Sequence, residues 1–143
     1  MAREYIPVAV ERLVRERAYQ RCEYCLSPAT ITSAPFSIEH IHPLARGGSN
    51  AEDNLALSCA WCNLSKGSFI DAIDSTTRLR VALFHPRRDL WQEHFRWSEN
   101  SEEIAALTAV GRVTIATLKL NRSELQNLRR VLVRSELHPP DEE

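Results

Sequence analysis

Apolar residues near the start of the chain recur at the spacing of an amphipathic helix. Separations of three or four positions place them on one face, and Pro7 suits the first helical position, so the pattern predicts a helix over residues 7–19. The opposite face carries arginines offset by glutamates, which favours a solvated surface, with contact to a nucleic-acid backbone as the alternative. The apolar positions are Val10, Leu13, Val14 and Ala18, and the arginines are Arg12, Arg15 and Arg17.

A different pattern, of short apolar runs between polar loops, follows in the middle of the chain. Residues 36–42 hold aromatic and β-branched side chains and predict a strand that Pro43 ends. Two glycines at 47–48 then open a polar loop, because glycine permits backbone angles that other residues resist. Residues 54–58 predict a second short strand, and residues 63–67 one or two turns of helix. The predicted order is strand, loop, strand, helix.

The segment 84–97 gathers four aromatic side chains. Trp91 and Phe95 are four positions apart and would meet on one face of a helix. We interpret them as core residues, with base stacking beside the neighbouring arginines as the alternative. Further on, residues 104–107 and 113–120 are apolar, and their pattern fits a strand and a helix equally well.

The last predicted element is a helix that begins at Asn121. Asn121 can serve as its N-cap, and Glu124, three positions later, completes a capping box. His138 and two prolines end the helix, and an acidic tail follows. The apolar face of this helix comprises Leu125, Leu128, Val131 and Leu132.

Length and composition indicate one soluble domain. The chain has 143 residues, of which 43% are hydrophobic, which suits a single domain of about 100 to 200 residues. We therefore predict one domain over residues 1–143, with a core motif at 20–70 and a C-terminal extension at 71–143. The apolar runs are too short for a membrane span, and the first residues lack the apolar core of a secretory signal, so we expect a cytoplasmic protein with no membrane contact.

The charge balance argues neither for nor against a nucleic-acid partner. The net charge is -1 and the pI is near 6.5, without the basic excess typical of nucleic-acid binders. The charge is uneven, however, since residues 1–88 carry +2 and residues 89–143 carry -3, and 16 of the 18 basic residues are arginine. We expect any non-specific binding to DNA to be weak and sensitive to salt concentration.

All four cysteines of the chain fall into two Cys-x-x-Cys pairs separated by 33 residues. Each pair can present two thiolates from one tight turn, and two such turns complete the tetrahedron that Zn²⁺ prefers. Two disulfides are disfavoured without a secretory signal, and a redox pair rarely occurs twice. The pattern therefore predicts one structural zinc ion, bound by Cys22, Cys25, Cys59 and Cys62.

A series of motifs lies between and directly after the cysteine pairs. In chain order they are Glu39-His40-Ile41-His42-Pro43, Gly47-Gly48, Asn54-Leu55, Cys59-x-x-Cys62-Asn63 and Lys66. Together these motifs resemble those of the HNH endonuclease family in its zinc-stabilised ββα-metal form, over about residues 20–70. The resemblance implies an α+β fold in which the ββα-metal (HNH) unit is stapled by the four-cysteine zinc site and flanked by N- and C-terminal helices.

The resemblance also implies roles for these residues. His40 would be the general base, because imidazole titrates near neutral pH. Glu39 and Asn63 would bind one catalytic divalent cation, Mg²⁺ or Mn²⁺, although aspartate is commoner than glutamate at the first position. Asn54 would brace the loop that orients His40. Candidate phosphate contacts are His42, Arg46 and Lys66.

One geometric question concerns the neighbours Glu39 and His40. Adjacent side chains of a regular strand point to opposite faces, whereas His40 and His42 would share a face. Either the strand is distorted at Glu39, as the resemblance implies, or His42 has a larger share of the site. We favour the first interpretation and keep His42 as an auxiliary contact.

The sequence therefore predicts a metal-dependent endonuclease that hydrolyses phosphodiester bonds in DNA. The alternative is a catalytically inactive, zinc-stabilised nucleic-acid-binding module, and a redox protein is the third hypothesis. The form of DNA that is cut and the oligomeric state do not follow from these motifs.

Overall fold

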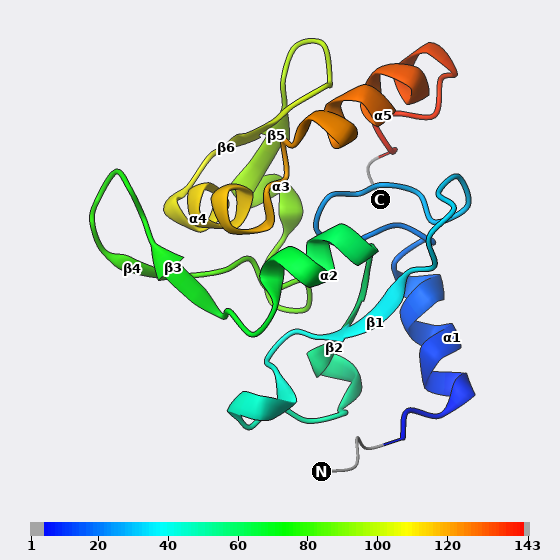
Figure 1. Cartoon of the computed structure of the whole chain (residues 1–143), viewed down its shortest axis with the longest axis vertical. Helices are drawn as coiled ribbons and strands as arrows, with labels where there is room; N and C mark the ends of the chain where they lie inside the picture. The colour runs from blue at the N-terminus through cyan, green and yellow to red at the C-terminus, as the bar shows by residue number, and fades with distance from the viewer. Residues whose placement is uncertain (1–4, 142–143) are drawn as a thin grey trace. The chain divides into compact units, whose positions relative to one another are not determined.

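The computed structural model describes residues 5–141, which form two compact units (Figure 1). The N-terminal unit contains the residues up to Ile70 together with His85–Arg88. The C-terminal unit contains Asp71–Phe84 and the residues from Asp89 onward. The division at Ile70 falls where the motif ends and the predicted extension begins. The single domain over residues 1–143 stays a prediction.

The elements of the N-terminal unit follow the predicted order. The strands β1 and β2 pair antiparallel, with Glu39 opposite Ala56 and His40 opposite Leu55. The helix α2 begins directly after Cys59, three residues earlier than predicted, so the second cysteine pair lies in its first turn. Two short 3₁₀ helices form the loop between the strands. The bounds are α1 Val8–Arg17, β1 Ser37–His40, η1 Leu44–Arg46, η2 Glu52–Asn54, β2 Leu55–Ser58 and α2 Ala60–Lys66.

The core of the N-terminal unit lies between α1 and the fully buried strand β2. Val14 and Ala18 of the predicted apolar face are buried, whereas Leu13 is 38% exposed. Arg17, predicted on the solvated face, instead donates through Nη2 to the carbonyl oxygens of Leu55 at 2.5 Å and Glu52 at 2.6 Å. The arginine thus ties the end of α1 to the start of β2.

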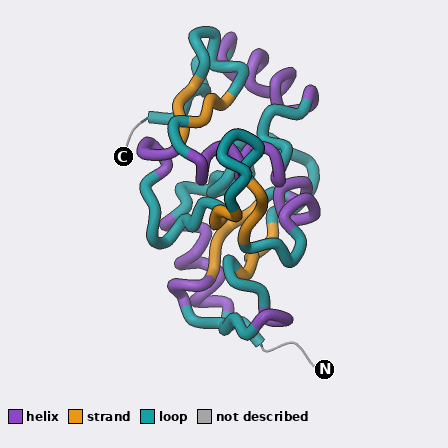
Figure 2. Tube along the Cα trace, turned by 90° about the vertical axis from the view of Figure 1, so that its left-hand side faces the viewer, coloured by secondary structure: helices purple, strands orange, loops and turns teal. Residues whose placement is uncertain are grey.

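The C-terminal unit contains short strands, one short helix and two longer helices. Figure 2 shows the strands of the molecule in orange and its loops in teal. Its strands form two antiparallel pairs, β3 with β4 and β5 with β6. The two apolar segments left open by the sequence become the strand β6 and the helix α4. The bounds are β3 Asp71–Ile73, β4 Arg80–Ala82, α3 Trp91–His94, β5 Phe95–Trp97, β6 Ile104–Ala106, α4 Ala109–Leu118 and α5 Ser123–Arg134.

Trp91 and Phe95 meet as predicted, but not on one helix. Their ring centroids are 5.1 Å apart, yet α3 ends at His94 and Phe95 begins β5. Phe95 is only 2% exposed and also packs edge-on against Phe84, at 5.4 Å between centroids. These contacts place Phe95 in the core of the C-terminal unit.

The predicted start of the last helix is wrong. The helix α5 begins at Ser123, with Arg122 at the N-cap position and no side-chain cap. Asn121 instead bonds the main chain of Ile104, accepting from its N–H at 2.7 Å and donating to its carbonyl at 2.8 Å. A pair of hydrogen bonds to a neighbouring strand has replaced the local cap.

The predicted apolar face of α5 is also revised. Val131 is 59% exposed, whereas Arg129 is 1% exposed. Arg129 donates to the carbonyl oxygens of Leu120 at 2.8 Å and Glu102 at 3.0 Å, and its guanidinium lies 5.2 Å from the ring centre of Trp97. An arginine can occupy this buried position because carbonyl oxygens and an aromatic ring compensate its charge.

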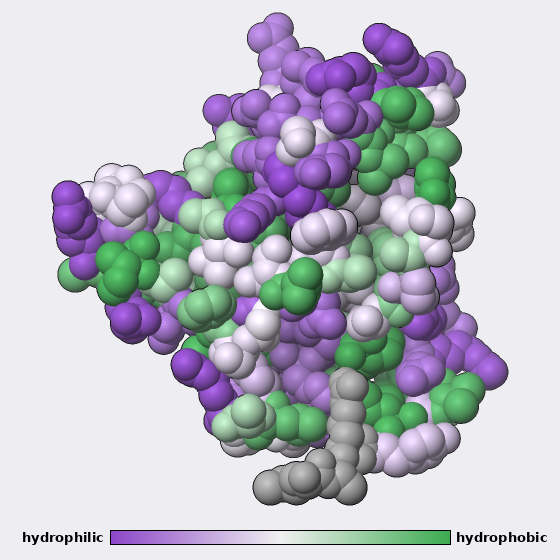
Figure 3. Space-filling model, viewed as in Figure 1, coloured by the Kyte–Doolittle hydropathy of each residue, from purple (hydrophilic) through white to green (hydrophobic). Residues whose placement is uncertain are grey.

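The surface fits the balanced composition. The face in Figure 3 mixes hydrophilic and hydrophobic residues, as is usual for a folded protein in water. Among residues 5–141, no helix is long and apolar enough to cross a membrane. The architecture is α+β, with helices and small antiparallel sheets.

Candidate functional site

The four cysteines form one buried cluster in the N-terminal unit. Their sulfur atoms all lie within 4.8 Å of one another, and the Sγ atoms of Cys25 and Cys59 are 3.8 Å apart. A tetrahedral Zn²⁺ ion with Zn–S bonds of about 2.3 Å has sulfur–sulfur edges of about 3.8 Å. Both the spacing and the all-sulfur donor set therefore fit a zinc ion, which would join the segment before β1 to the start of α2.

Local hydrogen bonds shape this cluster. The backbone N–H of Cys62 donates to the Sγ of Cys59 at 3.4 Å, which closes the first turn of α2 around the pair. Burial raises the pKa of Cys22, while hydrogen bonds from Cys22 and Cys25 lower the pKa of Cys59. Like charges in one buried cluster oppose one another, and a divalent cation is the group that lets several thiolates coexist there.

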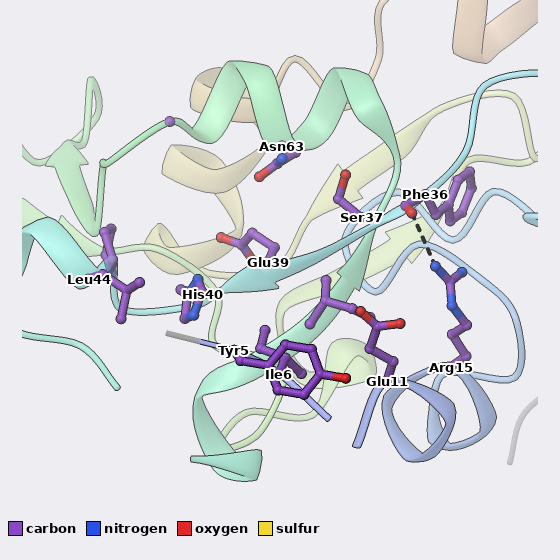
Figure 4. Close-up of a pocket in the computed structure, with 13 residues that line it drawn as sticks. Tyr5, Ile6, Glu11, Arg15, Phe36, Ser37, Glu39, His40, Leu44 and Asn63 are labelled. Carbon is purple, nitrogen blue, oxygen red and sulfur yellow. Dashed lines mark hydrogen bonds between the residues drawn. The ribbon is translucent and has the colours of Figure 1, made fainter. Parts of the chain in front are cut away.

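Next to the cluster, a groove of about 750 Å³ opens between α1, β1 and α2. Glu39 and His40 of β1 line it, as does Asn63 of α2, and Figure 4 shows the Asn63 side chain turned toward Glu39. Glu11 and Arg15 of α1 line its other side. The groove thus brings together the three residues to which the resemblance assigns the base and the metal ligands.

The carboxylate of Glu39 is held by two buried side chains. Tyr24 Oη donates to its Oε2 at 2.6 Å, and Lys66 Nζ forms an ion pair with its Oε1 at 2.6 Å. Burial, followed by the nearby charge of Glu39, raises the pKa of Tyr24 well above its usual range. The tyrosine therefore keeps its proton and acts as a hydrogen-bond donor. Both oxygens of Glu39 are located by partners from different segments.

The ring of His40 contacts Asn50 in the polar loop. Its Nε2 lies 2.5 Å from the Oδ1 of Asn50. Because an amide oxygen only accepts, Nε2 must carry the proton, and Nδ1 is left as the basic nitrogen of the neutral ring.

Asn54 connects the two ends of the loop between the strands. Its Oδ1 accepts from the N–H of His42 at 2.8 Å, and its Nδ2 donates to the carbonyls of His42 at 2.9 Å and Ser49 at 2.8 Å. The loop passes so close that a Cβ at Gly48 would collide with the carbonyl of His42, which explains the need for glycine. These hydrogen bonds join the two ends of the loop close to His40.

The three candidate phosphate contacts, His42, Arg46 and Lys66, do not line the groove with Glu39, His40 and Asn63. His42 donates through Nε2 to the carbonyl of Arg46 at 2.8 Å, and neither residue is among those that line the groove. Lys66 is 1% exposed and lies behind Glu39, where its Nζ also donates to the carbonyl of Ile41 at 2.8 Å. Glu39 and His40 line one groove although they are neighbours in a strand.

Sequence reasoning missed two side chains that contact the site, Tyr24 and Asn50. Tyr24 carried a signal, because it lies between two predicted zinc ligands and is therefore placed by the cluster. Asn50 carried none beyond its position in a polar loop, since its contact with His40 depends on how that loop folds back. Arg15, which the sequence placed on a solvated helix face with nucleic-acid contact as the alternative, also lines the groove.

The comparison with known families agrees with this geometry. Residues 22–69 match the family model described as HNH endonuclease. No curated protein and no solved structure matches the chain. The resemblance drawn from the motifs is thereby confirmed, and the matched segment contains the four-cysteine cluster together with Glu39, His40 and Asn63 of the groove.

Proposed function

We propose that this protein is a metal-dependent endonuclease that hydrolyses phosphodiester bonds in DNA. The observation that carries the proposal is the meeting of Glu39, His40 and Asn63 at one open groove within the segment that matches the HNH family. A carboxylate, an imidazole and an amide at the same groove supply what this hydrolysis needs from a protein, namely a base and hard oxygen ligands.

His40 is the general base in this proposal. With its Nε2 proton held by Asn50, the ring presents Nδ1 to a water molecule in the groove. The imidazole accepts a proton from that water as the oxygen attacks phosphorus, the bond between phosphorus and the 3′ oxygen breaks, and the leaving 3′ oxygen takes a proton from solvent. By the resemblance, the products carry 5′-phosphate and 3′-hydroxyl ends.

Glu39 and Asn63 would hold the catalytic cation. Carboxylate and amide oxygens are hard donors, which suit Mg²⁺ or Mn²⁺ better than they suit zinc. When bound, such a cation neutralises the charge that develops on the phosphoryl and leaving oxygens. The structural zinc would have four sulfur ligands and no open position, so it stabilises the fold and takes no part in the reaction.

Substrate contacts come from the groove and from the neighbouring loop between the strands. Arg15 lines the groove and Arg46 is exposed on η1, and both guanidinium groups can bind phosphate oxygens in pairs. His42 can add a contact at the same end of the loop. The buried position of Lys66 suits it to supporting Glu39 instead of touching phosphate.

The test is nicking of supercoiled plasmid in the presence of Mg²⁺ or Mn²⁺. The His40→Ala variant should lose activity while keeping its zinc and its circular dichroism spectrum. His85→Ala, which removes a histidine that does not line the groove, is the matched control and should nick like wild type. Equal nicking by His40→Ala would refute the mechanism, and DNA binding without cleavage by the wild type would support the non-catalytic binding module instead.

A further inference from the structure

Tyr24 lies between two zinc ligands and contacts a proposed ligand of a different metal. It occupies the turn from Cys22 to Cys25, and its side chain is 1% exposed. Its hydroxyl donates to Oε2 of Glu39 at 2.6 Å. One residue therefore joins the four-cysteine cluster to the groove.

We propose that Tyr24 is a positioning residue that transmits the placement of the four-cysteine cluster to the Glu39 carboxylate and so sets the affinity of the groove for a divalent cation. The inference rests on the proposed function, because it takes Glu39 as a ligand of that cation.

The argument begins with how the carboxylate is held. A glutamate has three rotatable bonds, and its long side chain can present either oxygen to a cation in several orientations. Here Tyr24 locates Oε2 and Lys66 locates Oε1, each at 2.6 Å. With both oxygens held, the carboxylate plane is set before a cation arrives, which lowers the entropic cost of binding it.

The two partners of Glu39 are themselves fixed in different ways. Lys66 belongs to α2 and also bonds the end of β1 through Ile41. Tyr24 has no helix or strand of its own, because it lies in a turn that the adjacent cysteines define. The position of Tyr24 is therefore fixed by the two neighbouring cysteines of the cluster. Through Tyr24, the cluster determines where one oxygen of Glu39 lies.

The hydroxyl of Tyr24 can be removed without emptying the core. Tyr24→Phe keeps the buried ring and deletes the hydroxyl that donates to Oε2, so that of these two partners Lys66 remains and the carboxylate is less constrained. Losing a partner of this kind weakens metal binding by about 10-fold to 100-fold in metal sites. The expected result is Mn²⁺ binding at least about 10-fold weaker, with zinc content unchanged and nicking recovered at high Mn²⁺.

The experiment measures Mn²⁺ binding to the full chain without DNA, from the electron paramagnetic resonance signal of free Mn²⁺. Zinc per chain and the Mn²⁺ concentration for half-maximal nicking are measured on the same samples. Tyr19→Phe is the matched control, because it removes the same hydroxyl from a side chain that is 61% exposed. This control should bind Mn²⁺ like wild type.

A second variant, Glu39→Asp, distinguishes positioning of the carboxylate from a general loss of structure. Glu39→Asp keeps a carboxylate ligand but draws it back from Tyr24 by one methylene group. In that background Tyr24→Phe should weaken Mn²⁺ binding much less than it does in wild type, since the hydrogen bond is already lost. Equal weakening in both backgrounds would overturn the proposal, because the hydroxyl would then act on the fold as a whole.

The remaining outcomes are also decisive. Wild-type affinity for Mn²⁺ in Tyr24→Phe would overturn the proposal while leaving the nuclease function intact. Loss of zinc by this variant would overturn it as well, since the hydroxyl would then serve the cysteine cluster. A wild type that binds Mn²⁺ but fails to nick would refute the proposed nuclease function and leave the comparison of Tyr24 variants valid. A wild type that binds no Mn²⁺ would overturn both.

Discussion

The carboxylate of Glu39 and the ammonium group of Lys66 form a buried ion pair with 2.6 Å between Oε1 and Nζ. Their side chains are 4% and 2% exposed, so water can solvate neither charge well. Lys66 comes from α2 and Glu39 from β1, and the pair joins the helix to the strand beside the groove that Glu39 lines. A charge buried in this way is tolerated only while its partner is present.

We therefore expect Lys66→Met to destabilise the protein strongly. The substitution leaves the Glu39 carboxylate buried without its counter-charge, and breaking a buried pair costs about 3–5 kcal/mol. Urea unfolding should show the loss as a lower midpoint. Lys119→Met, at the other and exposed lysine of the chain, is the control. Similar midpoints for the two variants would mean that the pair contributes nothing.

Asn50→Ala should slow nicking without preventing it. The variant removes the hydrogen bond to Nε2 of His40, so the ring is free to rotate and to carry its proton on either nitrogen. A single hydrogen bond of about 1 kcal/mol corresponds to roughly fivefold in rate. The rate of plasmid nicking and its pH profile provide the measurement. Asn127→Ala on the exposed side of α5 should leave both unchanged, and an unaltered rate in Asn50→Ala would separate Asn50 from catalysis.

Removal of zinc should unfold the N-terminal unit. Elemental analysis should find about one zinc per chain, and a strong chelator should abolish nicking together with the near-ultraviolet circular dichroism of the folded state. The reason is that metal binding and folding are thermodynamically linked, since the bound ion would join segments that are far apart in the chain. Cys62→Ser should reproduce the effect of the chelator. A metal-free chain that stays folded and active would contradict a structural role for zinc.

The C-terminal unit should lose stability in acid through Asp74. Its carboxylate accepts two hydrogen bonds from Arg112, at 2.9 and 3.0 Å, and two from Thr77. The bonds from Arg112, more than any other cause, lower the pKa of Asp74 well below its usual value of 3.8. Because the folded pKa is lowered, the stabilisation is complete above pH 3.8 and is lost as the pH falls below it.

Thermal unfolding between pH 7 and pH 2 tests this linkage. Asp74→Asn should melt at a lower temperature than wild type at neutral pH, and the difference should shrink as the pH falls below 3.8. Asp141→Asn, in the exposed C-terminal segment, is the control and should follow wild type. A constant difference across the range would show that Asp74 contributes through packing and not through its charge.

The sequence by itself determined the features that depend on spacing. The two Cys-x-x-Cys pairs predicted one cluster, and the sulfur atoms converge because two residues between cysteines suit a single turn. Periodicity predicted α1, since a buried helix face must repeat at the period of the helix. Aromatic and β-branched residues before a proline predicted β1, and a short apolar run predicted β2. The order of the motifs predicted the resemblance to the HNH family, because the residues of a catalytic and metal-binding site recur at fixed positions in a sequence motif.

Only the tertiary structure decided which partner each polar side chain has. Asn121 was predicted to cap a helix and instead bonds Ile104, 17 positions away. Lys66 was a candidate phosphate contact and is buried against Glu39. Arg129 lies on the buried face of α5, where the hydropathy pattern predicted apolar residues. The local sequence pattern does not predict these pairings. A buried polar side chain needs a hydrogen-bond or ion-pair partner, and that partner comes from another part of the fold.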